Sequence, residues 1–185
     1  MKEKIFENDI NKMPNLAFRG MKLVFKICYA IKPIDKYINS FNIKQGFTII
    51  DYGCGPGGYV KRASELVGNK GLVYAVDIHE LAISSVNKLK RKYSLNNVIA
   101  VHTDGITVDI NNNTADLIYA LDMFHMVKDT NGFLKELNRI AKPDSILIIE
   151  DGHQARDLSK EKIMKSECWE ITEEQKKHIK CKPIK

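Results

Sequence analysis

The sequence predicts an α/β domain in which helices cover both faces of a mostly parallel sheet. Short apolar runs alternate with longer segments of helical spacing, and this alternation is typical of successive βαβ units. A glycine-rich loop follows the first apolar run at residues 51–58, the place where folds of this class bind their ligands. The C-terminal tail departs from the alternation and predicts a hairpin instead.

Size and composition favour one domain. The chain has 185 residues, of which 44% are hydrophobic and 28% charged, and these values are ordinary for a single globular domain. No internal repeat or low-complexity linker interrupts it. We therefore expect one domain over residues 45–185, preceded by an N-terminal extension over residues 1–44.

Five short apolar runs are predicted to form the parallel strands, because helix-compatible segments separate them. The first run ends directly at the glycine-rich loop. In chain order the predicted strands are residues 48–52, 72–77, 98–102, 115–120 and 145–150.

Three segments of helical spacing lie among these strands. In the second of them, Ile83, Val86 and Leu89 recur on one face, while the outer face is basic. The third also gathers its apolar residues on one side, and Pro143 is expected to separate this helix from the strand that follows. The predicted helices are residues 58–67, 82–93 and 131–141.

The tail predicts a helix followed by an antiparallel pair. A helix is expected at residues 159–165, and two strand-like runs at 169–172 and 178–181 are joined by a charged turn. A hairpin added to the edge of a five-stranded parallel sheet gives a seven-stranded mixed sheet.

The extension over residues 1–44 is predicted to be helical, and it holds too many apolar residues to remain in water. Two roles stay open for it: a lid over the ligand crevice that shields the reacting group, or a helical layer packed on the sheet. Residues 1–50 also carry nine Lys and Arg against four Asp and Glu. This excess could attract an anionic substrate, RNA or a membrane surface, although a solvated helix face explains it more simply.

The cellular location of the protein and the redox state of its cysteines are predicted from signals that the sequence does not contain. The longest apolar stretch, residues 21–31, is about half of what a bilayer requires, and the first residues do not resemble a secretory signal. We therefore expect a cytoplasmic protein without a transmembrane helix. The four cysteines are too scattered for a zinc site or a redox dithiol, so we expect reduced thiols and no bound metal.

The glycine-rich loop matches G-x-G-x-x-G at Gly53, Gly55 and Gly58, which by itself indicates only a nucleotide-like ligand. Asp51, two residues before Gly53, discriminates between ligands. A carboxylate there suits the ammonium and sulfonium groups of S-adenosylmethionine (SAM) and repels the pyrophosphate of a dinucleotide. The loop therefore predicts SAM as the ligand.

Acidic residues also end the next two strands. Asp77 ends the second strand, where a carboxylate can accept both ribose hydroxyls of a nucleoside. Asp104 follows the third strand, where it could accept a hydrogen bond from an adenine amino group. Either residue could instead cap a helix or a turn, but acids at three successive strand ends favour a nucleoside site.

Together these motifs resemble those of class I SAM-dependent methyltransferases. The core D-x-G-x-G-x-G occurs at Asp51, Gly53, Gly55 and Gly57. The resemblance implies a Rossmann-like, doubly wound sheet of order 3-2-1-4-5-7-6 with strand 7 antiparallel, and SAM as the cofactor with S-adenosylhomocysteine as product. It assigns the methionine end to Asp51 and the loop, the ribose to Asp77, and the adenine to Asp104 and Gly105. The cofactor-binding residues it implies are Asp51, Gly53, Cys54, Gly55, Gly57, Asp77, Ile78, Asp104, Gly105 and Leu121.

The segment after the fourth strand indicates the kind of acceptor. Residues 121–127 are similar to the corresponding segment of small-molecule methyltransferases, such as those of quinone biosynthesis, and depart from the Asn/Asp-Pro-Pro-Tyr/Phe motif of enzymes that methylate nucleic-acid bases. The resemblance therefore implies a small-molecule methyl acceptor, and RNA is not favoured. If a general base is used, the candidates are His125 and Asp122, although either could be structural.

Two alternatives come from other classes. The first is an NAD-dependent oxidoreductase, which the short chain and Asp51 disfavour. The second is a noncatalytic SAM-binding or RNA-associated module that uses the basic first fifty residues to find its partner.

Overall fold

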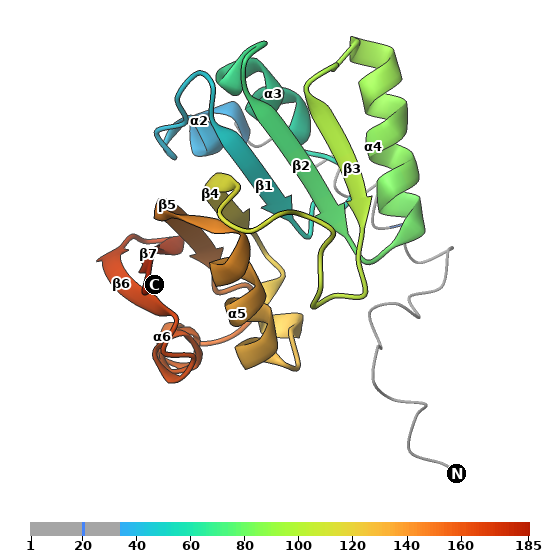
Figure 1. The fold of residues 1–185 in the computed structure, drawn as a ribbon. Coiled ribbons are helices and arrows are strands. Elements are labelled where there is room, and N and C mark those ends of the chain that lie inside the picture. The colour runs from blue at the N-terminus through green and yellow to red at the C-terminus, as the bar shows by residue number, and fades with distance from the viewer. Residues whose placement is uncertain (1–19, 21–33) are drawn as a thin grey trace.

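The computed structural model describes residue 20 and residues 34–185. The strands within residues 34–185 form a single seven-stranded sheet. The strand order is β3-β2-β1-β4-β5-β7-β6 (Figure 1). Strands β1 to β5 pair in parallel, and β7 is antiparallel to both β5 and β6. This confirms the predicted order and the antiparallel seventh strand. The strands are β1 Thr48–Tyr52, β2 Leu72–Asp77, β3 Val98–His102, β4 Ala115–Ala120, β5 Ala141–Glu150, β6 Trp169–Glu174 and β7 His178–Pro183.

The helices follow the predicted βα pattern. Their boundaries differ slightly from the prediction, and the last helix starts at Arg156, three residues earlier than expected. None of the described helices is long and apolar enough to cross a bilayer. The helices are α2 Ile34–Asn39, α3 Val60–Val67, α4 Glu80–Tyr93, α5 Thr130–Ile140 and α6 Arg156–Lys165, with a 3₁₀ turn at Phe124–Met126.

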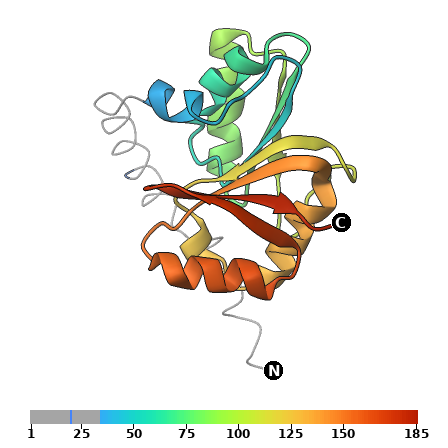
Figure 2. The same cartoon turned by 90° about the vertical axis from the view of Figure 1, so that its left-hand side faces the viewer.

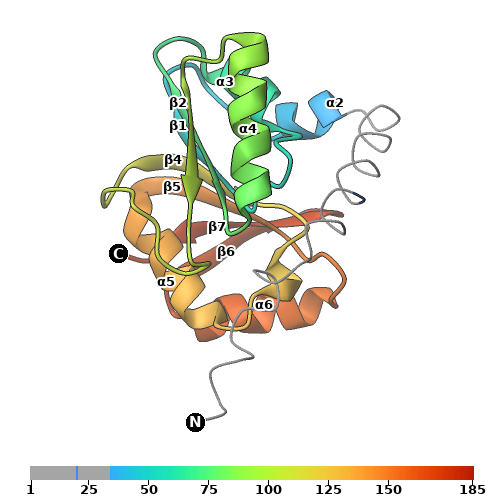
Figure 3. The ribbon, with the colours of Figure 1, turned by 90° about the vertical axis from the view of Figure 1, so that its right-hand side faces the viewer.

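The helices cover both faces of the sheet because the strands are apolar on both sides. Ile49 and Leu117 belong to a core shared with α2, α3 and α4, whereas their neighbours Ile50 and Ile118 belong to a second core shared with α5 and α6. Alternation along a strand sends successive side chains to opposite faces. Figures 2 and 3 show α2 and α3 on one side of the sheet, with α5 and α6 on the other.

The prediction that Pro143 separates the helix from its strand is wrong. The strand β5 begins at Ala141, directly after α5, and Pro143 lies inside it. Ala141 pairs with Ala115, but pairing resumes only at Ile146, opposite Leu117. Proline cannot donate to the ladder, so it is accommodated where the register is interrupted.

Asn97 connects the start of β3 to the end of α3, the helix that follows the glycine-rich loop. Its amide donates to the carbonyl oxygens of Ser64 at 3.0 Å and Gly68 at 2.9 Å, and it accepts from the Ser64 hydroxyl. These bonds add a side-chain donor to two carbonyl groups at the helix end, which also accept from the backbone N–H groups of Gly68 and Gly71.

We expect Asn97→Ala to lower the free energy of unfolding by about 1–3 kcal/mol, because the three hydrogen bonds of the Asn97 side chain are lost. Urea denaturation measures this change. The exposed neighbour Asn96 provides the control, since Asn96→Ala should change stability by less than about 0.5 kcal/mol. Equal effects of the two substitutions would contradict the assignment.

Candidate functional site

The glycine-rich loop joins β1 to α3 and is tied to the end of β2. The backbone N–H groups of Gly53 and Cys54 donate to the carbonyl oxygen of Val76 at 2.8 and 3.0 Å. Gly53, Gly55 and Gly57 have φ values of 77°, 51° and 87°, which side-chain-bearing residues rarely adopt. A Cβ at Gly53 would also lie 2.8 Å from Cγ of Met123. The spacing D-x-G-x-G-x-G, rather than the pattern ending at Gly58, therefore marks the conformationally constrained positions.

Asp51 is buried beneath this loop with no hydrogen-bond partner for Oδ2. Burial raises the pKa of its carboxyl group to about 8, and the nearby charge of Asp77 adds to the shift. Tyr119 lies opposite Asp51 in the neighbouring strand β4, and its buried hydroxyl also lacks a partner. A cationic group placed beside Asp51 would favour the ionised carboxylate and satisfy its free oxygen.

Asp77 connects the loop to the start of α4. Its Oδ2 accepts from the N–H of Gly55 at 2.8 Å, and its Oδ1 accepts from the N–H of His79 at 2.8 Å. Burial raises the pKa of Asp77, and these two hydrogen bonds oppose the rise. Because a carboxylate oxygen has two acceptor positions, these contacts leave capacity for ribose hydroxyls.

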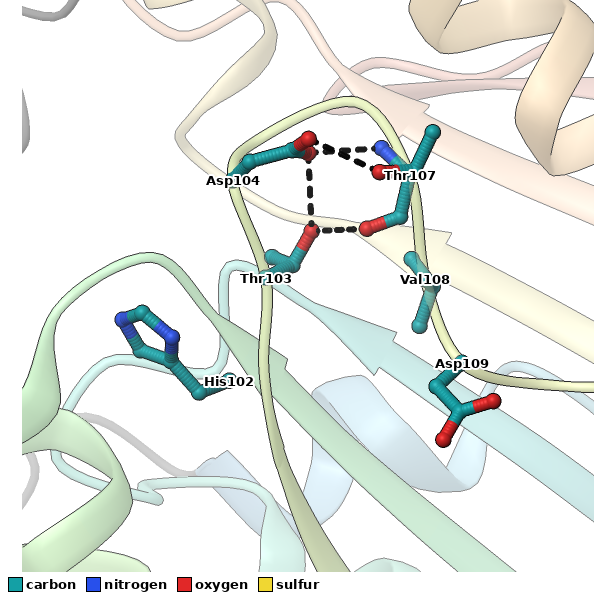
Figure 4. A pocket seen from close by; sticks show the side chains of 6 residues that line it. All are labelled: His102, Thr103, Asp104, Thr107, Val108 and Asp109. Atoms are coloured by element: carbon teal, nitrogen blue, oxygen red, sulfur yellow. Dashed lines mark hydrogen bonds between the residues drawn. The ribbon is translucent and has the colours of Figure 1, made fainter.

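Asp104 lies in a turn beside a hollow at the end of β3 (Figure 4). Its Oδ1 accepts from the N–H groups of Ile106 at 2.9 Å and Thr107 at 2.7 Å, and its Oδ2 from the Thr107 hydroxyl. These bonds hold the pKa of Asp104 below its usual value. Asp104 therefore stabilises its own turn, and its contact with adenine stays a prediction. The hollow is lined by His102, Thr103, Asp104, Thr107, Val108 and Asp109.

Two further predicted residues flank this turn. Gly105 has a φ of 101°, and a Cβ built there would lie 3.3 Å from Cγ2 of Ile78. The residue after β2 and the turn after β3 are therefore neighbours. The structure thus brings Ile78 and Gly105 together, as a shared nucleoside site requires.

The segment after β4 places Leu121 and Asp122 next to β5. Leu121 is 8% exposed, and Asp122 has a left-handed φ of 54°. Burial raises the pKa of Glu150 at the end of β5, and the nearby charge of Asp122 adds to the rise. Asp122, with its strained backbone, therefore lies near the end of the last parallel strand.

His125 packs against a different group of residues. Its ring lies edge-on to His153, with the ring centroids 4.9 Å apart, and its Nδ1 is buried without a partner. A Cβ at Gly152 would overlap the imidazole. Burial lowers the pKa of His125, so the neutral ring is favoured at pH 7. The structure does not join His125 to Asp122 by a hydrogen bond, and its role as a base stays a prediction.

The thiols and carboxylates do not form a metal centre in the part of the chain described. Cys54, Cys168 and Cys181 are free, and no group of three or more His, Cys, Asp or Glu residues is placed to hold a metal ion there. Burial raises the pKa of Cys54 well above its usual value, which keeps the thiol protonated.

Sequence reasoning missed three residues at the same edge of the sheet. Glu150 ends β5, His178 starts β7 opposite it, and Tyr37 of α2 lies with its hydroxyl 3.3 Å from Nδ1 of His178. An acid at a strand end, the signal that singled out Asp77, also marks Glu150. Tyr37 and His178 carry no such signal, because their positions depend on packing across the sheet.

A family model described as a methyltransferase domain matches residues 43–181. The chain belongs to this methyltransferase domain family. Demethylmenaquinone methyltransferase of Staphylococcus saprophyticus is 30% identical over 113 residues, which cover 61% of this chain and 48% of that protein. A probable cobalt-precorrin-6B C(15)-methyltransferase of Saccharolobus solfataricus is 38% identical over 65 residues, covering 35% of this chain and 33% of that protein.

Solved structures agree with the fold. A SAM-dependent methyltransferase from Aquifex aeolicus superposes with a TM-score of 0.74 at 24% identity, covering 82% of this chain and 90% of that one. A methyltransferase structure from Methanococcus maripaludis gives a TM-score of 0.69 at 22% identity, covering 90% and 91%. The chain therefore has the predicted class I fold. It spans about half the length of the demethylmenaquinone methyltransferases that it matches.

Asp51→Asn should change how the stability of the ligand-free protein depends on pH. Because the folded pKa of Asp51 is about 8 and the unfolded value is near 4, rising pH ionises the unfolded state first and destabilises the fold between those values. The variant has no ionisable group at residue 51 and therefore does not lose stability in this way as the pH rises. Its stability relative to the wild type should therefore rise from pH 5 to pH 8, by up to about 1.4 kcal/mol per unit. Urea denaturation at several pH values measures the difference, and a constant difference would contradict the prediction.

Proposed function

We propose that this protein transfers the methyl group of SAM to a small-molecule acceptor. The observation that carries the proposal is the buried, unpartnered Oδ2 of Asp51 beneath a loop of glycines. SAM bears an ammonium and a sulfonium and no phosphate, so a single buried carboxylate fits it and disfavours a dinucleotide. Family membership supports the same choice over an oxidoreductase.

The residues present fit the cofactor along its length. Asp51 and the loop residues Gly53, Cys54, Gly55 and Gly57 would hold the methionine end, where the absence of side chains lets the backbone approach. Asp77, beside Ile78, would accept the ribose hydroxyls, and the turn of Asp104 and Gly105 would border the adenine. Leu121 would cover the cofactor from the end of β4.

When bound, SAM supplies an activated methyl carbon for in-line displacement. The protein would align the acceptor with the methyl carbon and exclude water from the site. Asp122 follows Leu121 directly, so it would lie near the reacting groups. His125 is kept neutral by burial and is in the protonation state of a base, but its Nδ1 faces the Gly152 backbone.

The relatives indicate the class of acceptor. Their names give demethylmenaquinone and cobalt-precorrin-6B as substrates, and both are small molecules built on rings. We propose a ring-bearing small molecule for this chain as well, acting in the cytoplasm. The basic excess of residues 1–50 and most of the proposed lid fall outside the described residues, so an RNA-associated role stays a prediction.

Asp77→Ala should abolish the thermal shift that SAM produces while the fold survives. The ribose loses its acceptor and the loop loses its bond to Gly55, so we expect SAM affinity to fall at least tenfold, or about 1.4 kcal/mol. The exposed Asp157 offers the control, since Asp157→Ala should leave the shift unchanged. An unchanged shift in the Asp77 variant would place the ribose elsewhere.

SAM binding should release close to one proton at pH 6.5. Asp51 is protonated in the ligand-free protein because its pKa is about 8, and the cationic ligand favours its ionised form. Isothermal titration calorimetry in buffers of different ionisation enthalpy counts the proton. The release should disappear in Asp51→Asn, and a count that does not change would refute the role of Asp51.

A further inference from the structure

The side chain of Met123 lies against the backbone of Gly53, the first glycine of the loop. A Cβ built at Gly53 would be 2.8 Å from Cγ of Met123, 3.3 Å from its Cβ and 3.7 Å from its Cε. The contact therefore extends along the Met123 side chain, which occupies space that only a glycine at residue 53 leaves open. The segment after β4 thus packs directly on the loop that is proposed to bind SAM.

Met123 also begins a compact turn that is anchored in the core. The N–H of Met126 donates to the carbonyl oxygen of Met123 at 2.9 Å. The N–H of Val127 donates to the carbonyl oxygen of Phe124 at 3.2 Å. The side chain of Phe124 is fully buried, and its ring centroid lies 6.2 Å from that of Phe133 in α5. These hydrogen bonds connect the position of Met123 to the position of the whole turn.

The same turn reaches the loop after β5 on its other side. The ring of His125 lies edge-on to His153, with the centroids 4.9 Å apart, and a Cβ at Gly152 would overlap the imidazole. The turn therefore contacts the glycine-rich loop through Met123 and the loop after β5 through His125. Both predicted candidates for a general base, Asp122 and His125, belong to this segment.

The place where Met123 contacts the loop is close to the group that is proposed to bind the cofactor. Gly53 follows two residues after Asp51, whose Oδ2 is buried without a partner. A cationic ligand that satisfies this oxygen would fix the loop in one position. The unbranched side chain of methionine can adapt to the surface on which it packs. A change in the loop is therefore felt by the segment after β4 through Met123.

We propose that Met123 is a positioning residue that couples SAM binding at the glycine-rich loop to the order of the segment after β4. SAM that fixes the loop holds Gly53, and through it Met123, in one place, so the turn that Met123 begins opens less often. Coupling of this kind is reciprocal, so an ordered turn also favours bound SAM. The side of the site that carries Asp122 and His125 is thus completed after the cofactor binds. This inference rests on the proposed function.

Amide hydrogen exchange, followed by NMR on the full chain with and without saturating SAM, tests the coupling. The reporters are the N–H groups of residues 126 and 127, which are hydrogen-bonded within the turn and are not among the residues proposed to bind SAM. In the wild type SAM should slow their exchange at least about fivefold, the lower end of typical coupling between sites. In Met123→Ala the rates with and without SAM should agree within about twofold, while SAM still slows exchange at Gly55.

Two further variants separate coupling from packing. Met123→Leu conserves the volume of the side chain and should keep the slowing at both reporters. Met126→Ala is the matched control, because Met126 belongs to the same turn but is 39% exposed. It should keep the slowing at the N–H of Val127. If Met123 were only structural, Met123→Ala would speed exchange equally with and without SAM and leave their ratio as in the wild type.

Three results would overturn the inference. They are no slowing at residues 126 and 127 of the wild type while Gly55 is slowed, an unchanged slowing in Met123→Ala, and an equal loss of slowing in Met126→Ala. Each of them leaves the proposed function standing, because SAM still binds at the loop. The N–H of Gly55 donates to Oδ2 of Asp77, and exchange there that SAM does not slow in the wild type would instead remove the proposed function itself.

Discussion

A buried carboxyl group with one oxygen that lacks a hydrogen-bond partner is the constraint on which this site depends. Removing Asp51 from water is unfavourable in the ionised form, and the ligand-free protein avoids that charge by holding the proton. The glycines above it leave no Cβ in the way, and Asp77 holds the loop by Gly55. The arrangement is thus prepared for a positive ligand, which would complete the missing interactions.

The topology explains why the functional groups share one edge. Parallel strands end at the same side of a sheet, so Asp51, Asp77, the segment after β4 and Glu150 gather there. The strand β7 runs in the opposite direction, and its first residue, His178, therefore lies at the edge where β5 ends. An antiparallel final strand thus brings a residue from near the C-terminus beside groups that precede it by many residues.

Most of the fold was predictable because local patterns and long-range packing agree. The runs that form β1 to β4 have the predicted bounds. Those of β1, β2 and β4 are almost entirely buried inside the sheet, whereas β3 forms its edge and is partly exposed. The role of Pro143 was predicted wrongly because proline usually ends regular structure, while here a register shift accommodates it. For Asp104 the sequence left two interpretations open, a contact with adenine or the capping of a turn, since the same carboxylate can serve either purpose. The structure shows the bonds that cap the turn.

The sequence by itself determined the strands and their succession, and it predicted a SAM site from acids and glycines, because these depend on periodicity and on residues close together in the chain. Only the tertiary structure decided that Oδ2 of Asp51 is buried without a partner and that Tyr37 contacts His178, which lies opposite Glu150 in the sheet. Burial and contacts between distant segments arise when the sheet closes and the helices pack on it. They change the pKa of a carboxyl group in ways that no local pattern encodes.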